Sequence, residues 1–356
     1  MSTPPLDTSI RISRPLRVFA WLSFLAEVII IATGGAVRLT GSGLGCSEWP
    51  MCTPESLVPR FEIEGVHGAI EFGNRLMTGV VGILAIAVLL LVLHAVGGRR
   101  AVRRVLWYAL GGVAAAVLTY FLADATGLPA FVSASVALLV ATVIATVHTV
   151  RAEPARRDLT LLASLTVNGV VAQGLVGGIT VLTGLNPFIV GFHYTASLVL
   201  VCVTAAFIVR MHEPAGAREA AVPRWFAILV HVTGLPLAAT IVFGVLTTGS
   251  GPHSGDADVV REGFDASVMA HLHSWPGYIL AALVVTLTVL AVAGQLRPWR
   301  WLLAFTGVIL VQIFVGVWQA REGLPELLVG IHMVLAALSA AAYTVIVLRL
   351  KRPREG

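Results

Sequence analysis

Apolar residues in this chain are grouped into ten long runs. Each run is close to the roughly 20 residues that a helix needs to cross the hydrocarbon core of a bilayer. Gly and Pro residues lie in the turns between them. The pattern predicts an all-α polytopic membrane protein with about ten transmembrane helices. The runs cover residues 17–37, 69–94, 105–123, 129–150, 159–182, 187–209, 225–246, 268–293, 301–319 and 327–348.

One stretch occurs twice. Residues 173–193 read QGLVGGITVLTGLNPFIVGFH, and residues 312–332 read QIFVGVWQAREGLPELLVGIH. An internal repeat of this kind predicts two related helical halves, each with one histidine at the same depth. The positions that are identical at a constant offset of 139 are Gln173/Gln312, Val176/Val315, Gly177/Gly316, Gly184/Gly323, Leu185/Leu324, Val190/Val329, Gly191/Gly330 and His193/His332.

A second similarity supports the duplication, because Thr40–Gly43 recurs as Thr248–Gly251 at the ends of the first and seventh runs. Removing two extra runs from the first half leaves four helices in each half. An even number of spans per repeat predicts parallel, pseudo-symmetric four-helix bundles about an axis along the membrane normal. The expected domains are a first-half bundle (1–100 and 156–215), a two-helix insertion (101–155) and a second-half bundle (216–356).

Composition agrees with this class, since 57% of the residues are hydrophobic and 12% are charged. Nineteen of the 24 Lys and Arg residues fall on one predicted side of the membrane. The positive-inside rule therefore predicts a multi-pass protein of the cell (plasma) membrane with both termini in the cytoplasm. The basic residues report topology, and no soluble basic face for nucleic acid is present. The five on the other side are Arg38, Arg60, Arg75, Arg261 and Arg321.

Cys46 and Cys52 lie in GLGCSEWPMC, within the first predicted outer loop (39–66). A closely spaced pair outside the cytoplasm favours a disulfide bond over two free thiols. Exposure of the pair leaves a redox role open. Cys202, inside an apolar run, is interpreted as core packing.

Five histidines begin even-numbered predicted helices, in the outer part of the membrane. Facing imidazoles from different helices of a bundle are a common way to hold a haem iron. Zinc fits less well, because thiolate or carboxylate ligands are not grouped with these histidines. The pattern favours haem binding. The histidines are His67, His193, His271, His273 and His332.

His67, Glu71, Asn74 and Arg75 are spaced i, i+4, i+7 and i+8, so they share one helix face. A carboxylate beside a ligand-type residue can move protons or stabilise a cationic intermediate. The alternative for Glu71 is a simple i,i+4 ion pair with Arg75. Arg38 and Arg75, on the outer side, suit bidentate contacts with haem propionates.

Several motifs, taken in this order, resemble the haem A synthase family: GGAVRLTGSGLGCSEWPMC, AIEFGNR, QGLVGGITVLTG followed by GFH, HLHSW and LVGIH. The resemblance implies two four-helix halves with paired histidines and a cysteine pair in the first outer loop. It also implies oxidation of the C8 methyl of haem O to the formyl of haem A, with a bound b-type haem as cofactor. Two successive hydroxylations would give a gem-diol that loses water.

In the first half, the resemblance implies the site for the substrate, haem O. Glu71 matches the essential carboxylate of a Glu-x-x-His-Arg motif, and His193 matches the second histidine of this half. Asn74 stands where the family has a histidine, which we interpret as an actinobacterial form. Either His67, two turns earlier on the same face, replaces that ligand, or this half holds haem through one ligand.

In the second half, the resemblance implies the site for haem b. His332 is one axial ligand of the iron, and its partner is either His273 or His271, with His273 favoured. Two residues apart on a helix, His271 and His273 cannot face the same way. The implied iron ligands of the whole chain are therefore His273, His332 and His193.

The implied partners are haem O, an electron donor that the resemblance does not specify, the lipid bilayer, and possible association with haem O synthase and oxidase assembly factors. One alternative is a non-catalytic cytochrome b that transfers electrons between two bis-histidine haems. Asn74 and the one-sided carboxylate argue against that symmetry. A transporter is less favoured, because the ionisable groups cluster at one side and not at the midplane.

Overall fold

The computed structural model describes residues 12–253, 255–256, 259 and 265–354. In this part of the chain nine helices are long and apolar enough to span a membrane, which confirms the all-α polytopic class. Arg11, Arg261 and residues 254, 257–258 and 260–264 of the predicted outer loop 248–266 lie outside the described residues. The elements are α1 (Arg14–Leu39), α2 (Phe61–Ala125), α3 (Ala130–Ala152), α4 (Arg157–Leu182), α5 (Pro187–Met211), β1 (Arg218–Ala220), α6 (Arg224–Ser250), α7 (Ala266–Ala293), α8 (Trp299–Arg321), α9 (Glu326–Arg349) and β2 (Lys351–Pro353).

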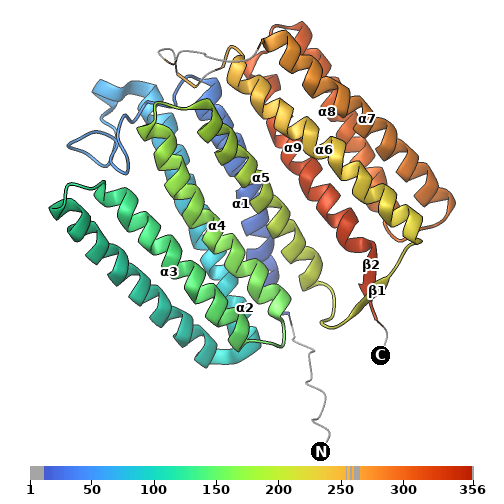
Figure 1. Ribbon diagram of the computed structural model, residues 1–356, viewed down its shortest axis with the longest axis horizontal. Coiled ribbons are helices and arrows are strands. Elements are labelled where there is room, and N and C mark those ends of the chain that lie inside the picture. Colours follow the sequence, from blue (N-terminus) through green and yellow to red (C-terminus); the bar gives the residue numbers. More distant parts are fainter. Residues whose placement is uncertain (1–11, 254, 257–258, 260–264, 355–356) are drawn as a thin grey trace, which may run out of the picture.

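Helix α2 contains two of the predicted runs, 69–94 and 105–123. A straight helix of its 65 residues would be roughly 100 Å long at 1.5 Å per residue, about three times the hydrocarbon thickness. The chain instead turns back at Gly98, whose φ of 63° and ψ of −157° are essentially restricted to glycine. Gly65 breaks the helix in the same way near its start. Residues 66–97, the first arm, and 99–125, the second arm, are therefore two separate spans (Figure 1).

The helices close into two rings. In the first ring α1 contacts α2, α2 contacts α4, α4 contacts α5, and α5 contacts α1. In the second ring α6, α7, α8 and α9 contact one another in the same cyclic order. Helix α3 and the second arm of α2 lie beside the first ring, at one edge of the molecule (Figure 1). Consequently α2 and α5 stand diagonally opposite in one ring, as α7 and α9 do in the other.

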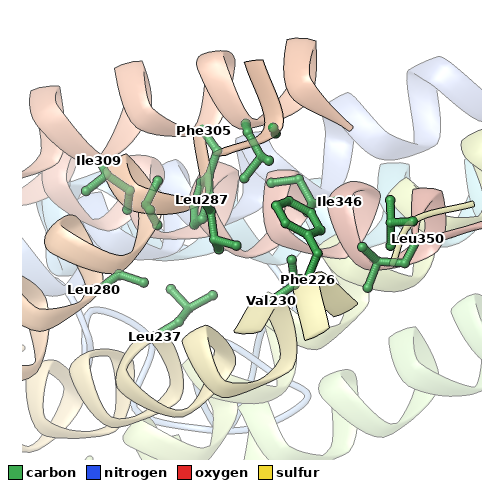
Figure 2. Packing of buried hydrophobic residues seen from close by; sticks show 13 residues of the cluster. Phe226, Val230, Leu237, Leu280, Leu287, Phe305, Ile309, Ile346 and Leu350 are labelled. Carbon is green, nitrogen blue, oxygen red and sulfur yellow. The ribbon is translucent and has the colours of Figure 1, made fainter. Parts of the chain in front are cut away.

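An apolar core fills one end of the second ring. Phe226 from α6, Leu287 from α7, Phe305 from α8 and Ile346 from α9 are all nearly inaccessible to solvent, and Figure 2 shows their side chains converging. Lipid chains are as apolar as leucine, so close packing rather than hydrophobicity alone holds such helices together. This core occupies the part of the ring remote from the starts of α7 and α9, where the polar residues lie.

The two rings meet along α5 and α9 at positions related by the internal repeat. The Tyr194 hydroxyl donates to the Met333 carbonyl at 3.0 Å, and Leu198 packs in one cluster with Ala337. Both pairs are separated by 139 residues, the offset of the repeat. We propose that the rings correspond to the domains 1–100 with 156–215 and 216–356, with 101–155 as the insertion.

Candidate functional site

Two histidines face each other across the second ring. His273 lies near the start of α7 and His332 near the start of α9, on diagonally opposite helices. Their ring centroids are 5.9 Å apart, and the ring planes make an angle of 72°. The chain thus brings two imidazoles from different helices to one point, at the end of the ring where α7 and α9 begin.

The tautomer of His273 follows from its hydrogen bond. Its Nδ1 lies 2.8 Å from the Thr240 carbonyl on α6. A carbonyl only accepts, so Nδ1 carries the proton and Nε2 keeps a free lone pair. Metal-binding histidines commonly use their second nitrogen in this way. Gly244, one turn further on α6, lies so close that a Cβ there would be 2.9 Å from the imidazole, which fixes the position of the ring.

His332 rests on the neighbouring helix α8. A Cβ at Gly316 would lie 3.0 Å from its Cε1, and Gln312 Nε2 donates to its carbonyl at 3.1 Å. His332 Nδ1, Gln312 Oε1 and Gln319 Oε1 are buried without a hydrogen-bond partner in the described part of the chain. Such orphaned polar atoms are rare in native structures and point to a missing ligand, ion or water.

These residues fit a haem. A bond between a metal and an imidazole nitrogen is about 2 Å long, so two imidazoles on opposite sides of one metal hold their ring centres roughly 6 Å apart. The separation of 5.9 Å between His273 and His332 agrees with this value. The described residues contain no group of three or more His, Cys, Asp or Glu that would hold a bare metal ion. A two-ligand site is suited to a metal whose other ligands come from a porphyrin.

The first ring contains a related arrangement around His193 on α5. Gln173 Nε2 donates to the His193 carbonyl at 2.8 Å, which fixes the orientation of the amide. The Gln173 Oε1 is therefore an acceptor, and it lies 3.2 Å from His193 Nδ1. The proton is on Nδ1 and the Nε2 lone pair is free. Gly177 packs against the imidazole of His193, as Gly316 packs against the imidazole of His332.

Asn74 occupies the place in the first ring that His273 occupies in the second. It lies on α2, diagonally opposite α5, and accepts a hydrogen bond from Thr33 Oγ1 of α1 at 2.8 Å. His273 is anchored on α6, the counterpart of α1, but as a donor, because its Nδ1–H donates to the Thr240 carbonyl. In the described part of the chain, neither Asn74 nor His67 has a hydrogen bond or ring contact with His193.

The other two candidate histidines are directed elsewhere. His67 is exposed, and its Nδ1 lies 2.9 Å from Ser42 Oγ in the loop that follows α1. His271 is exposed, and its Nδ1 lies 2.7 Å from the carbonyl of Ser267, one turn earlier on α7. Their assignment as haem ligands stays a prediction.

Glu71 and Arg75 clamp the loop between α1 and α2 onto α2. Glu71 Oε2 accepts from the Cys46 amide at 2.6 Å, and Glu71 Oε1 accepts from Arg75 Nη2 at 2.6 Å. The ion pair considered as an alternative is therefore present. Arg75 also donates to the carbonyls of the same loop, those of Cys46, Glu48, Pro50 and Met51. Charge-assisted hydrogen bonds of this kind are strong and fix geometry.

Cys46 and Cys52 form a disulfide bond, as predicted. Both residues are 0% exposed, so the expectation of an exposed pair was wrong. The cause is the clamp of Glu71 and Arg75, which holds the loop against the helices. No short-range sequence pattern encodes this contact.

Trp49 of the same loop packs its indole against α4, a helix of the first ring. A Cβ at Gly178 of α4 would lie 2.3 Å from the Trp49 indole, so the indole lies directly on the helix backbone. Gly178 follows Gly177, which contacts His193. In the second half the equivalent position is Val317. The two rings therefore differ, because only the first has room on this helix for a covering tryptophan.

Arg38, near the end of α1, joins the two halves. Its Nε donates to the His253 carbonyl at 2.8 Å, and its Nη2 donates to the Thr248 carbonyl. His253 Nε2 in turn lies 2.8 Å from the Leu324 carbonyl. The expected contact of Arg38 and Arg75 with haem propionates stays a prediction, since these hydrogen bonds go to backbone carbonyls.

Sequence reasoning missed the role of two residues and one buried acid. Gln173 and Gln312 were visible as identical repeat positions, which was the available signal for their contacts with the histidines. Glu27 of α1 is 1% exposed, and its Oε1 has no partner among the described residues. A carboxyl group inside an apolar run is a functional candidate by default, so its presence in LAEVIII was the missed signal.

Comparison with known proteins finds similarity to proteins whose names refer to haem or to cytochrome oxidase assembly. Residues 17–122 match a family model described as "Cytochrome oxidase assembly protein". This segment includes 101–122, so the similarity extends into the predicted insertion. A protein named "Heme A synthase" from Exiguobacterium sibiricum is 37% identical over 79 residues, which are 22% of this chain and 26% of that protein.

Two other similar proteins also have names that refer to haem. A "Heme A synthase" from Lysinibacillus sphaericus is 27% identical over 188 residues, 52% of this chain and 42% of that protein. A "Protoheme IX farnesyltransferase" from Thermus thermophilus is 37% identical over 78 residues, 22% of this chain and 12% of that protein. The matched segments thus span between about a tenth and two fifths of these relatives.

Proposed function

We propose that this protein is a haem A synthase, an oxidoreductase that converts the C8 methyl of haem O to a formyl group by successive hydroxylations. The observation that carries the proposal is the contrast between two related rings. One ring presents a facing pair of imidazoles, His273 and His332. The other has one imidazole, His193, opposite Asn74, beneath a clamped loop with a carboxylate. Similarity to proteins named "Heme A synthase" supports the same conclusion.

The second ring is the site for a resident b-type haem. His273 and His332 would hold the iron, and the Thr240 carbonyl and Gln312 would orient the two imidazoles. When bound, this haem supplies one-electron redox chemistry. A haem held by both imidazoles would be suited to electron transfer more than to direct reaction with substrate.

The first ring is the site for the substrate, haem O. His193 would be its single strong ligand, because an asparagine at position 74 binds iron poorly. A site that must release its product benefits from such an asymmetry. Trp49 and the disulfide loop cover the site from outside, and they would exclude water from the reacting methyl group.

Glu71 would act at this same site. Its two oxygens are held by the Cys46 amide and by Arg75, so the carboxylate is preorganised and needs no rearrangement to act. Oε1 accepts from both Nε and Nη2 of Arg75, whereas Oε2, which accepts from the Cys46 amide, keeps a lone pair that is able to accept a proton or stabilise positive charge at the substrate. We assign Glu71 this catalytic role and assign Arg75 the positioning of Glu71 and the loop.

The remaining assignments complete the proposal. The termini lie in the cytoplasm and the Cys46–Cys52 loop lies outside the plasma membrane. Haem O comes from an enzyme that farnesylates protohaem, a class to which a similar protein from Thermus thermophilus belongs by name. Association with that enzyme and with oxidase assembly factors, and reduction by a separate electron donor, are part of the proposal.

The test uses membranes from cells that supply haem O and express the wild type, Glu71→Ala or Glu55→Ala. Glu55 is a matched control, because its side chain is 76% exposed in the same outer loop. Extraction and chromatography should show haem A for the wild type and Glu55→Ala. Glu71→Ala should stop at haem O or a hydroxylated intermediate. Haem A at the wild-type level from Glu71→Ala would refute the catalytic role of Glu71.

A non-catalytic cytochrome b is the second candidate, favoured by the His273–His332 pair alone. It predicts haem b in the purified wild type and no conversion of haem O. The same extraction therefore separates the two functions.

A further inference from the structure

A basic cavity lies at the turn between the two arms of α2. Its volume is about 460 Å³, and its lining consists of His94, Arg99, Arg100, Val102, Arg103 and Leu106. The cavity does not include the candidate haem ligands His193, His273 and His332. It is at the end of the molecule that also holds the β1–β2 ribbon (Figure 1), the side predicted to be cytoplasmic.

All three arginines of the lining have uncompensated charge. Arg104, the fourth arginine of this turn, pairs with Glu153. Arg99, Arg100 and Arg103 are exposed and have no ion pair within the described residues. Gly98, whose φ of 63° makes the turn, brings His94 of the first arm to the arginines of the second. Grouped guanidinium groups match the geometry of a phosphate.

The apolar part of the cavity continues along the exposed face of the second arm of α2. Leu106 lines the cavity, and Leu110, Val113 and Val117 follow it at helical spacing. These four side chains are between 51% and 58% exposed. Arg99 and Arg103 lie on the same face, because 99, 103, 106, 110, 113 and 117 follow the i, i+4, i+7 pattern. The second arm therefore presents a cationic end joined to a long apolar stripe.

An aromatic residue marks the depth of the arginines. Trp107, which follows Leu106, is 65% exposed. Exposed tryptophan is typical of the level of the lipid headgroups. The arginines one turn earlier thus lie where phosphates of lipids are found, and the stripe lies where acyl chains are found.

We propose that this surface is a binding site for an anionic phospholipid of the cytoplasmic leaflet. The phosphate of the headgroup binds Arg99, Arg100 and Arg103, and the acyl chains lie along Leu106, Leu110, Val113 and Val117. The apolar stripe selects a lipid over a small soluble phosphate, and the net positive charge selects an anionic lipid over a zwitterionic one. This inference is independent of the proposed enzyme activity.

The experiment uses the full-length chain in detergent, titrated with phosphatidylglycerol or phosphatidylcholine and analysed by native mass spectrometry. The wild type should retain phosphatidylglycerol in preference to phosphatidylcholine. The triple variant Arg99→Gln, Arg100→Gln, Arg103→Gln should bind phosphatidylglycerol about 100-fold more weakly, because each lost arginine weakens binding about fivefold. Arg151→Gln with Arg157→Gln is the matched control, since both are exposed on the same predicted side, and it should bind like the wild type.

Two further measurements complete the test. If the triple variant does not fold, Arg103→Gln alone should weaken binding about fivefold. Glycerol 3-phosphate and inorganic phosphate should not displace the lipid. Equal retention of the two lipids, unchanged binding in the arginine variants, or displacement by inorganic phosphate would each overturn the proposal.

Discussion

Replacement of Gly316 by alanine should disturb the pair of imidazoles in the second ring. The new Cβ would lie 3.0 Å from His332 Cε1, whereas carbon atoms in good contact are about 3.5–4.0 Å apart. The ring of His332 must therefore move by roughly 0.5 Å or more. Distances in a metal site are tolerant to only about 0.2 Å, so this displacement is large for the ligand.

A matched control lies on the same helix. Gly307 of α8 has nothing within 4 Å of an added Cβ, and alanine is a better helix former than glycine by up to about 1 kcal/mol. Gly307→Ala should therefore be neutral or slightly stabilising. Gly244→Ala acts from the other side, because its Cβ would lie 2.9 Å from His273, and should resemble Gly316→Ala.

The assay is a haem titration of the purified variants, with the haem-to-protein ratio and the optical spectrum as readouts. Changes that misplace a metal ligand commonly weaken binding 10- to 100-fold, so Gly316→Ala and Gly244→Ala should lose haem in that range and Gly307→Ala should not. If Gly316→Ala binds haem as tightly as Gly307→Ala, with the same spectrum, His332 does not hold the iron in this geometry.

Other changes test the first ring. Asn74→His supplies a second imidazole opposite His193, so the amount of tightly bound haem per chain should rise and the release of product should slow. Gln173→Leu removes the acceptor of His193 Nδ1, so haem O affinity measured by titration should fall about 10- to 100-fold. Gln173→Glu keeps an acceptor but loses the donor to the His193 carbonyl, so it should restore the affinity only in part. Gly178→Val introduces a Cβ 2.3 Å from Trp49, so conversion of haem O should fall while haem in the second ring stays at the wild-type ratio. If bound haem, haem O affinity and haem O conversion are unchanged in these variants, Asn74, Gln173 and Gly178 are not part of the substrate site.

Helix positions could be read from the sequence because each span is a long apolar run, and length alone decides whether a run crosses the bilayer. The repeat of Gln173–His193 as Gln312–His332 also placed two histidines at equal depth. The sequence also predicted the two spans within α2 as separate runs. It did not predict that a single residue, Gly98, makes the turn between them.

The candidate site depended on contacts between distant segments. The clamp of Glu71 and Arg75 on the disulfide loop joins residues 24 to 29 positions apart, and Trp49 reaches Gly178 on α4. Helical periodicity predicts which residues share a face, but it does not say which loop folds over that face. For the same reason the sequence left His271 and His273 as alternatives, whereas side-chain direction places only His273 against His332.

The most direct test of the proposed activity is the haem content of membranes that contain the wild-type chain and haem O, compared with membranes that lack the chain. The proposal predicts that haem A accumulates only when the chain is present, and that the purified protein retains haem b. A chain that purifies with haem b but leaves haem O unchanged would contradict the synthase and favour electron transfer. A colourless protein, purified where haem is plentiful, would contradict haem binding altogether.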